Sequence, residues 1–354
     1  MKWGFRWYGE NQDSVPIEFI KQIPGINGII GTLINKLPGE KWEIDEILEL
    51  KNKVELHNLE LLGIESVAVH DSIKAGTSER DYYIENYIET IKNLSRCGIH
   101  LICYSFKPIF GWARTNLSSK NEDGSFSMLY DQKVINHMEA SEMYTLISNQ
   151  SGGFKLPGWE KERLDKFYDL SKLYEDITEE DLFENLKYFL LKIIPVCEEY
   201  SVKMAIHPDD PPWEIFNYPR ITKNLEDLKK ITDIIDSPSN GITFCSGSLG
   251  ASPNNDLEEI IFAIKDKINF VHLRNIEYIA EKNFRETAHL SEEGSLDLYS
   301  LMKKLIDIGY TGVVRPDHGR TIWDEKAMPG YGLNDRALGL GYLQGLHEAI
   351  KKSL

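Results

Sequence analysis

The sequence of 354 residues predicts an α/β fold, a (β/α)₈ TIM barrel, on two observations. Short apolar runs alternate with longer amphipathic runs along the chain, and eight apolar runs are present, the number that such a barrel needs. The stretch after the first apolar run, RWYGENQD, is not the glycine-rich phosphate turn typical of an open doubly wound sheet. We expect residues 1–354 to form a single domain, because α/β barrels of this size are single units.

The eight predicted strands are compact apolar segments bounded by glycine, proline or polar residues. They cover residues 2–8, 25–31, 65–70, 100–106, 202–207, 241–247, 268–274 and 312–317. Apolar positions that recur every three to four residues predict helices between them. These helices cover residues 16–23, 44–62, 78–97, 181–200, 224–235, 256–264, 295–308 and 335–352. Gly63 is predicted to follow the second helix as its C-cap residue, and Ser78 to cap the start of the third.

Residues 107–180 interrupt this alternation after the fourth strand. They are polar, aromatic and rich in turn residues, with one predicted helix at residues 132–147. Connections of this length in a compact domain are usually lids or oligomer contacts. We therefore expect an inserted helical and loop region within the barrel, and a homo-oligomer, most simply a dimer.

The composition limits the partners of the protein. The net charge of −16 and the isoelectric point near 5.1 argue against nucleic acid, which binds a basic surface. The sequence contains neither an apolar run long enough for a membrane span nor, in its opening MKWGFRWYGE, the apolar segment of a signal peptide. We expect a cytoplasmic protein that acts on a small molecule.

Four polar residues stand at the ends of the last four predicted strands: His207, Cys245, His272 and Asp317. Successive side chains of a strand point to opposite faces, so each of the four is the last inward residue of its strand. The carboxyl ends of barrel strands meet at one rim, where barrel enzymes keep their active sites. Imidazole, thiolate and carboxylate groups are ligands of divalent metals, so the sequence predicts a mononuclear metal site.

Each of these residues also has an ordinary structural explanation. A single histidine at a strand end is more often hydrogen-bonded than metal-bound, and cysteine is among the most buried residue types. Asp317 alone could cap a loop. The equivalent positions on four successive strands favour the metal site. Cys97, Cys103 and Cys197 are expected to belong to the core.

Eight short motifs resemble the mannonate dehydratase family, and the resemblance extends over nearly the whole chain. The motifs are RWYG (6–9), CYSFKP (103–108), HPDDPP (207–212), CSGSLG (245–250), FVHLRN (270–275), ETAHL (286–290), RPDHG (315–319) and PGY (329–331). The resemblance implies a xylose-isomerase-like barrel that removes water from D-mannonate to give 2-keto-3-deoxy-D-gluconate in hexuronate (glucuronate) catabolism. It also implies Mn²⁺ or Fe²⁺ as the cofactor and the four residues named above as its ligands.

The same resemblance implies that His318 and Tyr331 are the acid and base residues. The reaction needs a base at C2, an acid at the C3 hydroxyl and a cation that stabilises the negative charge. The alternative for His318 is a hydrogen bond to the carboxylate of Asp317, and that for Tyr331 is simple packing. The thiolate ligand alone would favour Zn²⁺, and the resemblance makes zinc the less expected metal.

Further polar residues near strand ends are candidates to bind a sugar acid, although ordinary loop salt bridges explain them equally well. They are Arg6, His70, Lys107, Arg274 and Asn275. Two other functions stay open: a sugar isomerase or epimerase of the same barrel type, and a barrel that binds a metal or ligand without catalysis.

Overall fold

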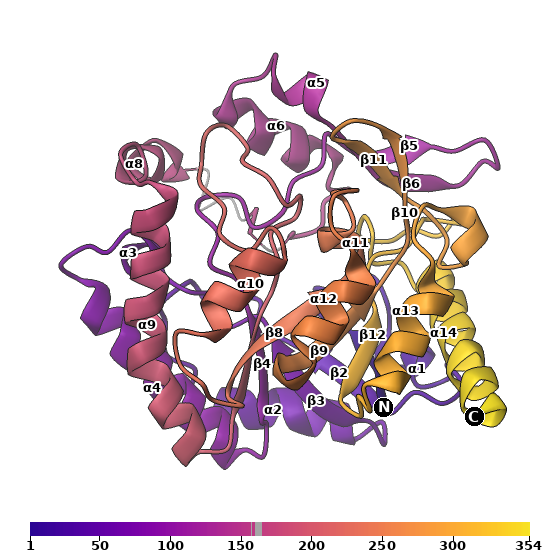
Figure 1. Ribbon diagram of the computed structural model, residues 1–354, viewed down its shortest axis with the longest axis horizontal. Helices are drawn as coiled ribbons and strands as arrows, with labels where there is room; N and C mark the ends of the chain where they lie inside the picture. Colours follow the sequence, from indigo (N-terminus) through magenta and orange to yellow (C-terminus); the bar gives the residue numbers. More distant parts are fainter. Residues whose placement is uncertain (157, 160–164) are drawn as a thin grey trace.

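The computed structural model describes residues 1–156, 158–159 and 165–354, and its centre is a closed barrel of eight parallel strands (Figure 1). Around the barrel the order is β1-β12-β9-β8-β7-β4-β3-β2. The strands are β1 (Lys2–Arg6), β2 (Gly28–Gly31), β3 (Glu60–Glu65), β4 (Leu101–Tyr104), β7 (Lys203–Ile206), β8 (Asn240–Cys245), β9 (Ile268–Leu273) and β12 (Val313–Pro316). The prediction of an α/β barrel is confirmed.

Helices surround the strands and separate most of them along the chain (Figure 1). They are α1 (Ile17–Ile20), α2 (Ile44–Glu55), α3 (Asp71–Lys74), α4 (Arg80–Arg96), α9 (Glu179–Glu199), α10 (Leu225–Thr232), α11 (Ser246–Leu249), α12 (Leu257–Ala263), α13 (Leu298–Asp307) and α14 (Asn334–Ser353). Across the described part of the chain, every helix is too short or too polar to cross a bilayer.

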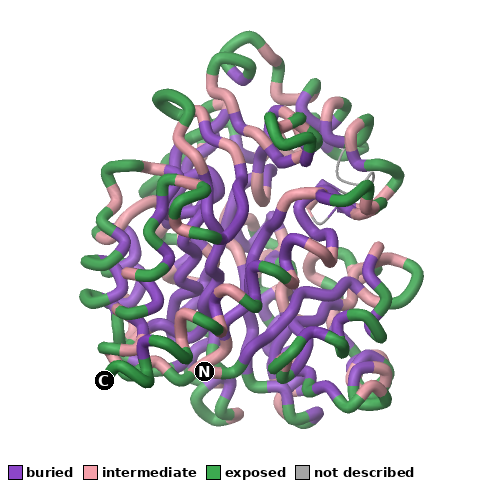
Figure 2. Tube along the Cα trace, turned by 90° about the vertical axis from the view of Figure 1, so that its right-hand side faces the viewer, coloured by how far each residue is buried: buried purple, intermediate pink, exposed green. Residues whose placement is uncertain are grey.

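The core has two layers, which the alternation of strand side chains creates. The outer layer lies between the strands and the helices and holds most of the buried apolar residues. The inner layer fills the barrel and consists of Ile30, Leu62, Leu101, Cys103, Ala205 and Phe270, with Val313 packed against it. In Figure 2 the buried segments gather in the interior, and the exposed ones lie at the periphery. Residues two positions beyond Ala205, Phe270 and Val313 therefore continue the inward face toward the carboxyl ends of the strands.

The segment after β4 combines with a later loop to form a second sheet. This sheet is antiparallel, in the order β10-β11-β6-β5, and lies beside α5 and α6 in the upper part of Figure 1. Its strands are β5 (Asn116–Lys120), β6 (Phe126–Asp131), β10 (Ile276–Ala280) and β11 (Asn283–Glu286). The helix predicted at residues 132–147 is instead two helices, α5 (Gln132–Ile135) and α6 (Ala140–Gln150), and α8 (Phe167–Leu173) follows.

The boundary between the second helix and the third strand was predicted wrongly. The helix ends at Glu55, and Asn58 adopts a positive φ of 56°, which asparagine tolerates better than most residues. Gly63 is not a C-cap residue but lies inside β3, which spans Glu60–Glu65 instead of residues 65–70. Leucines at 59, 61 and 62 continue the helical period by chance, although Leu62 points into the barrel and Leu61 packs outside it.

The start of the third helix also differs from the prediction. Ser78 was expected to cap it, but the helix begins after Glu79, whose side chain makes no capping hydrogen bond.

Candidate metal and proton-transfer site

Three of the four predicted metal ligands lie together at the carboxyl ends of β7, β8 and β9. Cys245 is paired with His272 in the register of β8 and β9, and His207 follows β7 directly. The ligand atoms of His207, Cys245 and His272 all lie within 4.8 Å of one another. Strand alternation places these side chains on the inward face, above Ala205 and Phe270.

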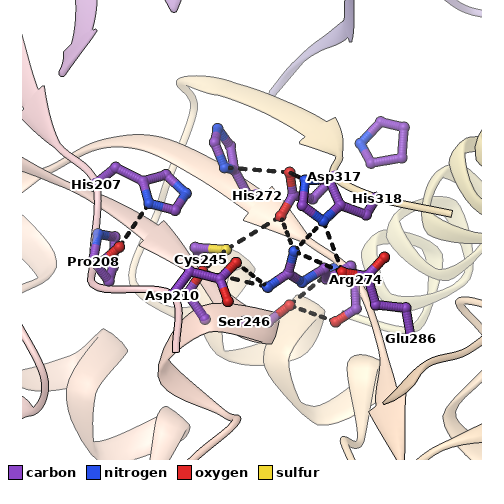
Figure 3. A network of polar contacts seen from close by, with 12 residues as sticks. His207, Pro208, Asp210, Cys245, Ser246, His272, Arg274, Glu286, Asp317 and His318 are labelled. Atoms are coloured by element: carbon purple, nitrogen blue, oxygen red, sulfur yellow. Dashed lines mark hydrogen bonds and ion pairs between the residues drawn. The ribbon is translucent and has the colours of Figure 1, made fainter. Parts of the chain in front are cut away.

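Asp317, the fourth residue, borders this cluster from the end of β12 (Figure 3). Its Oδ2 lies 3.4 Å from the Sγ of Cys245, and its Oδ1 lies 3.8 Å from the Nδ1 of His272. Burial alone would raise the pKa of Asp317, but its neighbours His318, Arg274 and Arg315 hold it well below its usual range. The carboxylate is therefore ionised beside the cluster.

The protonation of the cluster suits a cation. The Nδ1 of His207 lies 2.8 Å from the carbonyl oxygen of Pro208, which can only accept a hydrogen bond, and a proton on Nδ1 leaves the lone pair of Nε2 for a metal ion. Burial, with Lys107 next, lowers the pKa of His207 well below its usual range, and burial followed by Arg315 lowers that of His272. Burial and Asp317 raise the pKa of the Cys245 thiol to about 12, so a thiolate here needs a neighbouring cation.

A second group of possible ligands consists of Glu65, Cys103 and His272. The positively charged guanidinium of Arg315 lies against this group. The Nε of Arg315 lies 3.0 Å from Glu65 Oε2 and 3.2 Å from His272 Nε2, and its Nη2 lies 2.8 Å from Glu65 Oε1. The Sγ of Cys103 accepts a hydrogen bond from Thr243. The Glu65 carboxylate of the second group is thus already engaged in an ion pair with Arg315.

His318 and Tyr331 face each other next to Asp317. The Nε2 of His318 lies 2.9 Å from the hydroxyl of Tyr331, and its Nδ1 lies 2.8 Å from Glu286 Oε1. Burial, followed by Tyr8, raises the pKa of Tyr331 well above its usual range, so its phenol carries a proton. A carboxylate, an imidazole and a phenol thus form one buried hydrogen-bonded chain, a suitable arrangement for moving a proton.

A cavity of about 190 Å³ opens onto both groups. Its walls include His207, Asp317, His318 and Tyr331, and also two of the predicted substrate contacts, Arg6 and Lys107. The Nη1 of Arg6 donates to the carbonyl oxygens of Trp7 and Ile30, at 3.1 Å each, which fixes the guanidinium at the wall.

The other three predicted substrate contacts lie outside the lining of this cavity. The Nδ1 of His70 caps α3 by accepting from the amide of Ser72 at 3.0 Å, and its ring stacks on Tyr83. Asn275 holds its own loop, because its amide donates to the carbonyl of Leu290. Arg274 pairs with the carboxylates of Asp210, Glu286 and Asp317.

The chain matches the family model described as D-mannonate dehydratase (UxuA) over residues 1–354. It belongs to the D-mannonate dehydratase family. A mannonate dehydratase of Enterococcus faecalis is 64% identical over 99% of this chain and 98% of the relative, and one of Thermotoga petrophila is 53% identical over the same shares. The crystal structure of mannonate dehydratase from Streptococcus suis matches 100% of this chain and 95% of that chain, with a TM-score of 0.90 and 41% identity.

More distant structures share the fold. A xylose isomerase domain protein from Planctomyces limnophilus matches 99% of the chain with a TM-score of 0.58 and 11% identity. This likeness shows the barrel architecture alone and agrees with the xylose-isomerase-like barrel that the motifs implied.

Sequence reasoning missed several charged residues that surround the site of this family member. Glu286, Arg114, Glu65 and Arg315 are all engaged in buried ion pairs. Arg315 lies two residues before Asp317, so strand alternation places both side chains on the same, inward face. Glu65 was hidden because β3 was predicted five residues too late, although it is the last residue of the observed strand.

Proposed function

We propose that this member of the D-mannonate dehydratase family removes water from D-mannonate to give 2-keto-3-deoxy-D-gluconate, a hydro-lyase reaction of hexuronate catabolism. The observation that supports it best is one cavity bordered by two kinds of group. His207 and Asp317 line it on the side of the metal-ligand cluster, and His318 and Tyr331 supply proton donors and acceptors beside them. An elimination of water next to a carboxylate needs both.

The metal of this proposal is Mn²⁺ or Fe²⁺, held by His207, Cys245, His272 and Asp317. Two neutral imidazoles, an ionised carboxylate and a thiol with a raised pKa fit a divalent cation. When bound, such a cation supplies positive charge that stabilises the negative charge developing next to the substrate carboxylate. The thiolate would also accept Zn²⁺, and the choice of Mn²⁺ or Fe²⁺ rests on the resemblance to the family.

Arg6 and Lys107 are the proposed contacts of the sugar acid. Both are buried cations on the cavity wall of a protein with a net charge of −16, so they favour an anion there. The ammonium of Lys107 lies 3.3 Å from the Nδ1 of His207, which places it beside the metal-ligand cluster. We propose that these two cations orient the carboxylate so that C2 and C3 face His318 and Tyr331.

The oligomeric state and the compartment stay predictions. A cytoplasmic dimer is expected from the sequence, and light scattering on the purified protein checks the dimer.

An assay with a small set of substrates tests the proposed function. Protein purified without oxygen and loaded with Mn²⁺ or Fe²⁺ is incubated with D-mannonate, and the 2-keto-3-deoxy acid is measured by mass spectrometry and a colour reaction. We expect the product to lack one water. Conversion of aldoses or ketoses without loss of water would identify an isomerase or epimerase instead. If His318→Asn and Tyr331→Phe changed no reaction, a binding protein without catalysis would be the better explanation.

A further inference from the structure

Glu286 lies at the end of β11, outside the barrel, yet its side chain reaches the proposed proton-transfer pair. Its Oε1 lies 2.8 Å from the Nδ1 of His318 and is fully buried (Figure 3). Arg114 donates to the same oxygen at 2.8 Å and Arg274 at 3.3 Å. Burial alone would raise the pKa of Glu286, but His318 and the two guanidinium groups lower it, so its carboxylate is ionised.

The Nδ1 of His318 has two neighbours that require opposite protonation. Glu286 Oε1 can only accept a hydrogen bond, whereas the Nη1 of Arg274, 2.5 Å away, can only donate one. A proton on Nδ1 satisfies Glu286, and a lone pair there satisfies Arg274.

Arg274 has other acceptors, and this favours a proton on Nδ1. Its guanidinium pairs with Asp210 at 2.7 Å and with Asp317 at 3.1 Å, in addition to Glu286. Among the described residues, Glu286 provides the acceptor that a protonated Nδ1 contacts. A lone pair on Nδ1 would only add a fourth acceptor for Arg274, which already pairs with three carboxylates, and it would leave Glu286 without a donor from His318.

We infer that Glu286 is a positioning residue that keeps a proton on the Nδ1 of His318 and so turns Nε2 toward the hydroxyl of Tyr331 as the proton acceptor. The inference rests on the proposed dehydratase function and deepens it, because it makes His318 the base of the pair. When the lone pair of Nε2 takes a proton, from the hydroxyl of Tyr331 or from substrate, the N–H bond at Nδ1 stays intact. The resulting imidazolium then lies against the Glu286 carboxylate, which stabilises its charge.

Asp210 offers a matched control within the same network. It pairs with Arg114 at 2.8 Å and with Arg274 at 2.7 Å, as Glu286 does, but no hydrogen bond joins it to His318 in the described structure (Figure 3). Asp210→Asn therefore removes one negative charge from the same two arginines and leaves the imidazole partner in place.

The first test measures the tautomer directly and does not depend on activity. Protein labelled with ¹⁵N-histidine and loaded with diamagnetic Zn²⁺ gives long-range ¹H–¹⁵N correlations, and His318→Asn identifies the signals of His318. We expect the proton of the His318 ring on Nδ1 in the wild type and in D210N. A ring protonated at Nε2 in the wild type would overturn the inference.

The second test compares steady-state kinetics of E286Q and D210N at equal metal content. We expect E286Q to lose between about 10²- and 10⁴-fold in kcat with KM within about threefold, because the uncharged amide cannot stabilise the imidazolium. D210N should keep a kcat at least about tenfold above that of E286Q, with a comparable fall in Tm. Equal losses in the two variants, or a loss of E286Q confined to KM, would overturn the positioning role. If the wild type did not dehydrate D-mannonate, the proposed function would fail, and the tautomer measurement would still decide the role of Glu286.

Discussion

Arg274 and Asp317 form a buried ion pair, with 3.1 Å between Nη1 and Oδ2. The other carboxylate oxygen of Asp317 is occupied as well, because the Nη2 of Arg315 lies 3.0 Å from Oδ1. The proposed metal ligand is thus compensated by two guanidinium groups before any cation binds. Because both oxygens of the buried carboxylate are in ion pairs, its negative charge is compensated even without a metal ion.

Removal of the metal is therefore expected to leave the barrel folded. With metal at about 100 times its dissociation constant, binding adds about 2.7 kcal/mol, which corresponds to a rise in Tm of roughly 4 °C for a chain of this length. Calorimetry of protein treated with a chelator, before and after metal is restored, measures this shift. If the chelator alone unfolded the protein at 25 °C, the ion pairs of Asp317 would not be sufficient to keep the barrel folded without metal.

Cys245→Ser should change the preference of the site between metals. Thiolate is a soft ligand that suits Zn²⁺ more than Mn²⁺, so we expect the affinity for Zn²⁺ to fall about 100-fold and that for Mn²⁺ about tenfold or less. Competition with a chromophoric chelator measures both constants. Cys97→Ser is the control, because Cys97 is also buried but ends α4 and lies outside the cluster. An equal change for both metals in C245S would argue against a thiolate ligand.

Tyr331→Phe removes the hydroxyl that lies 2.9 Å from His318 Nε2 and keeps the ring. We expect kcat to fall by about 10² to 10⁴ with little change in KM, because the hydroxyl acts on the proton and not on binding. Tyr8 provides a comparison, since its ring packs edge-on against Tyr331 at 5.1 Å and lines the same cavity. Tyr8→Phe should lower kcat by less than about tenfold, and similar losses in both variants would point to a general effect of the cavity wall.

The positions of site residues could be predicted from the sequence where they depend on a single strand. Strand alternation together with strand ends predicted that His207, Cys245 and His272 come together, because each position follows from its own strand and the closure of the barrel. The chemistry of these side chains then indicated a metal site, and the motifs indicated the family that the comparisons show.

Contacts between distant loops could not be predicted in this way. Arg114 and Glu286 are 172 positions apart and meet only because β5 and β6 join β10 and β11 in one sheet. No local period encodes that pairing, since it depends on which loops pack together above the barrel. His70 and Asn275 show the reverse case, in which polar residues near predicted strand ends cap a helix and fix a loop.

The observed start of β3 at Glu60 leads to a test in the barrel itself. Gly28 lies opposite Glu60 in the register of β2 and β3, and a Cβ atom at Gly28 would lie 2.0 Å from the carbonyl oxygen of Glu60. Because backbone must move to relieve this contact, Gly28→Ala should lower the free energy of unfolding by about 3 kcal/mol or more. Gly4→Ala is the matched control, since its nearest neighbours lie at 3.4 Å, and should change stability by less than about 1 kcal/mol. Denaturant titrations of both variants measure the difference, and equal stabilities would place Glu60 outside the strand, as the helical period of the sequence had suggested.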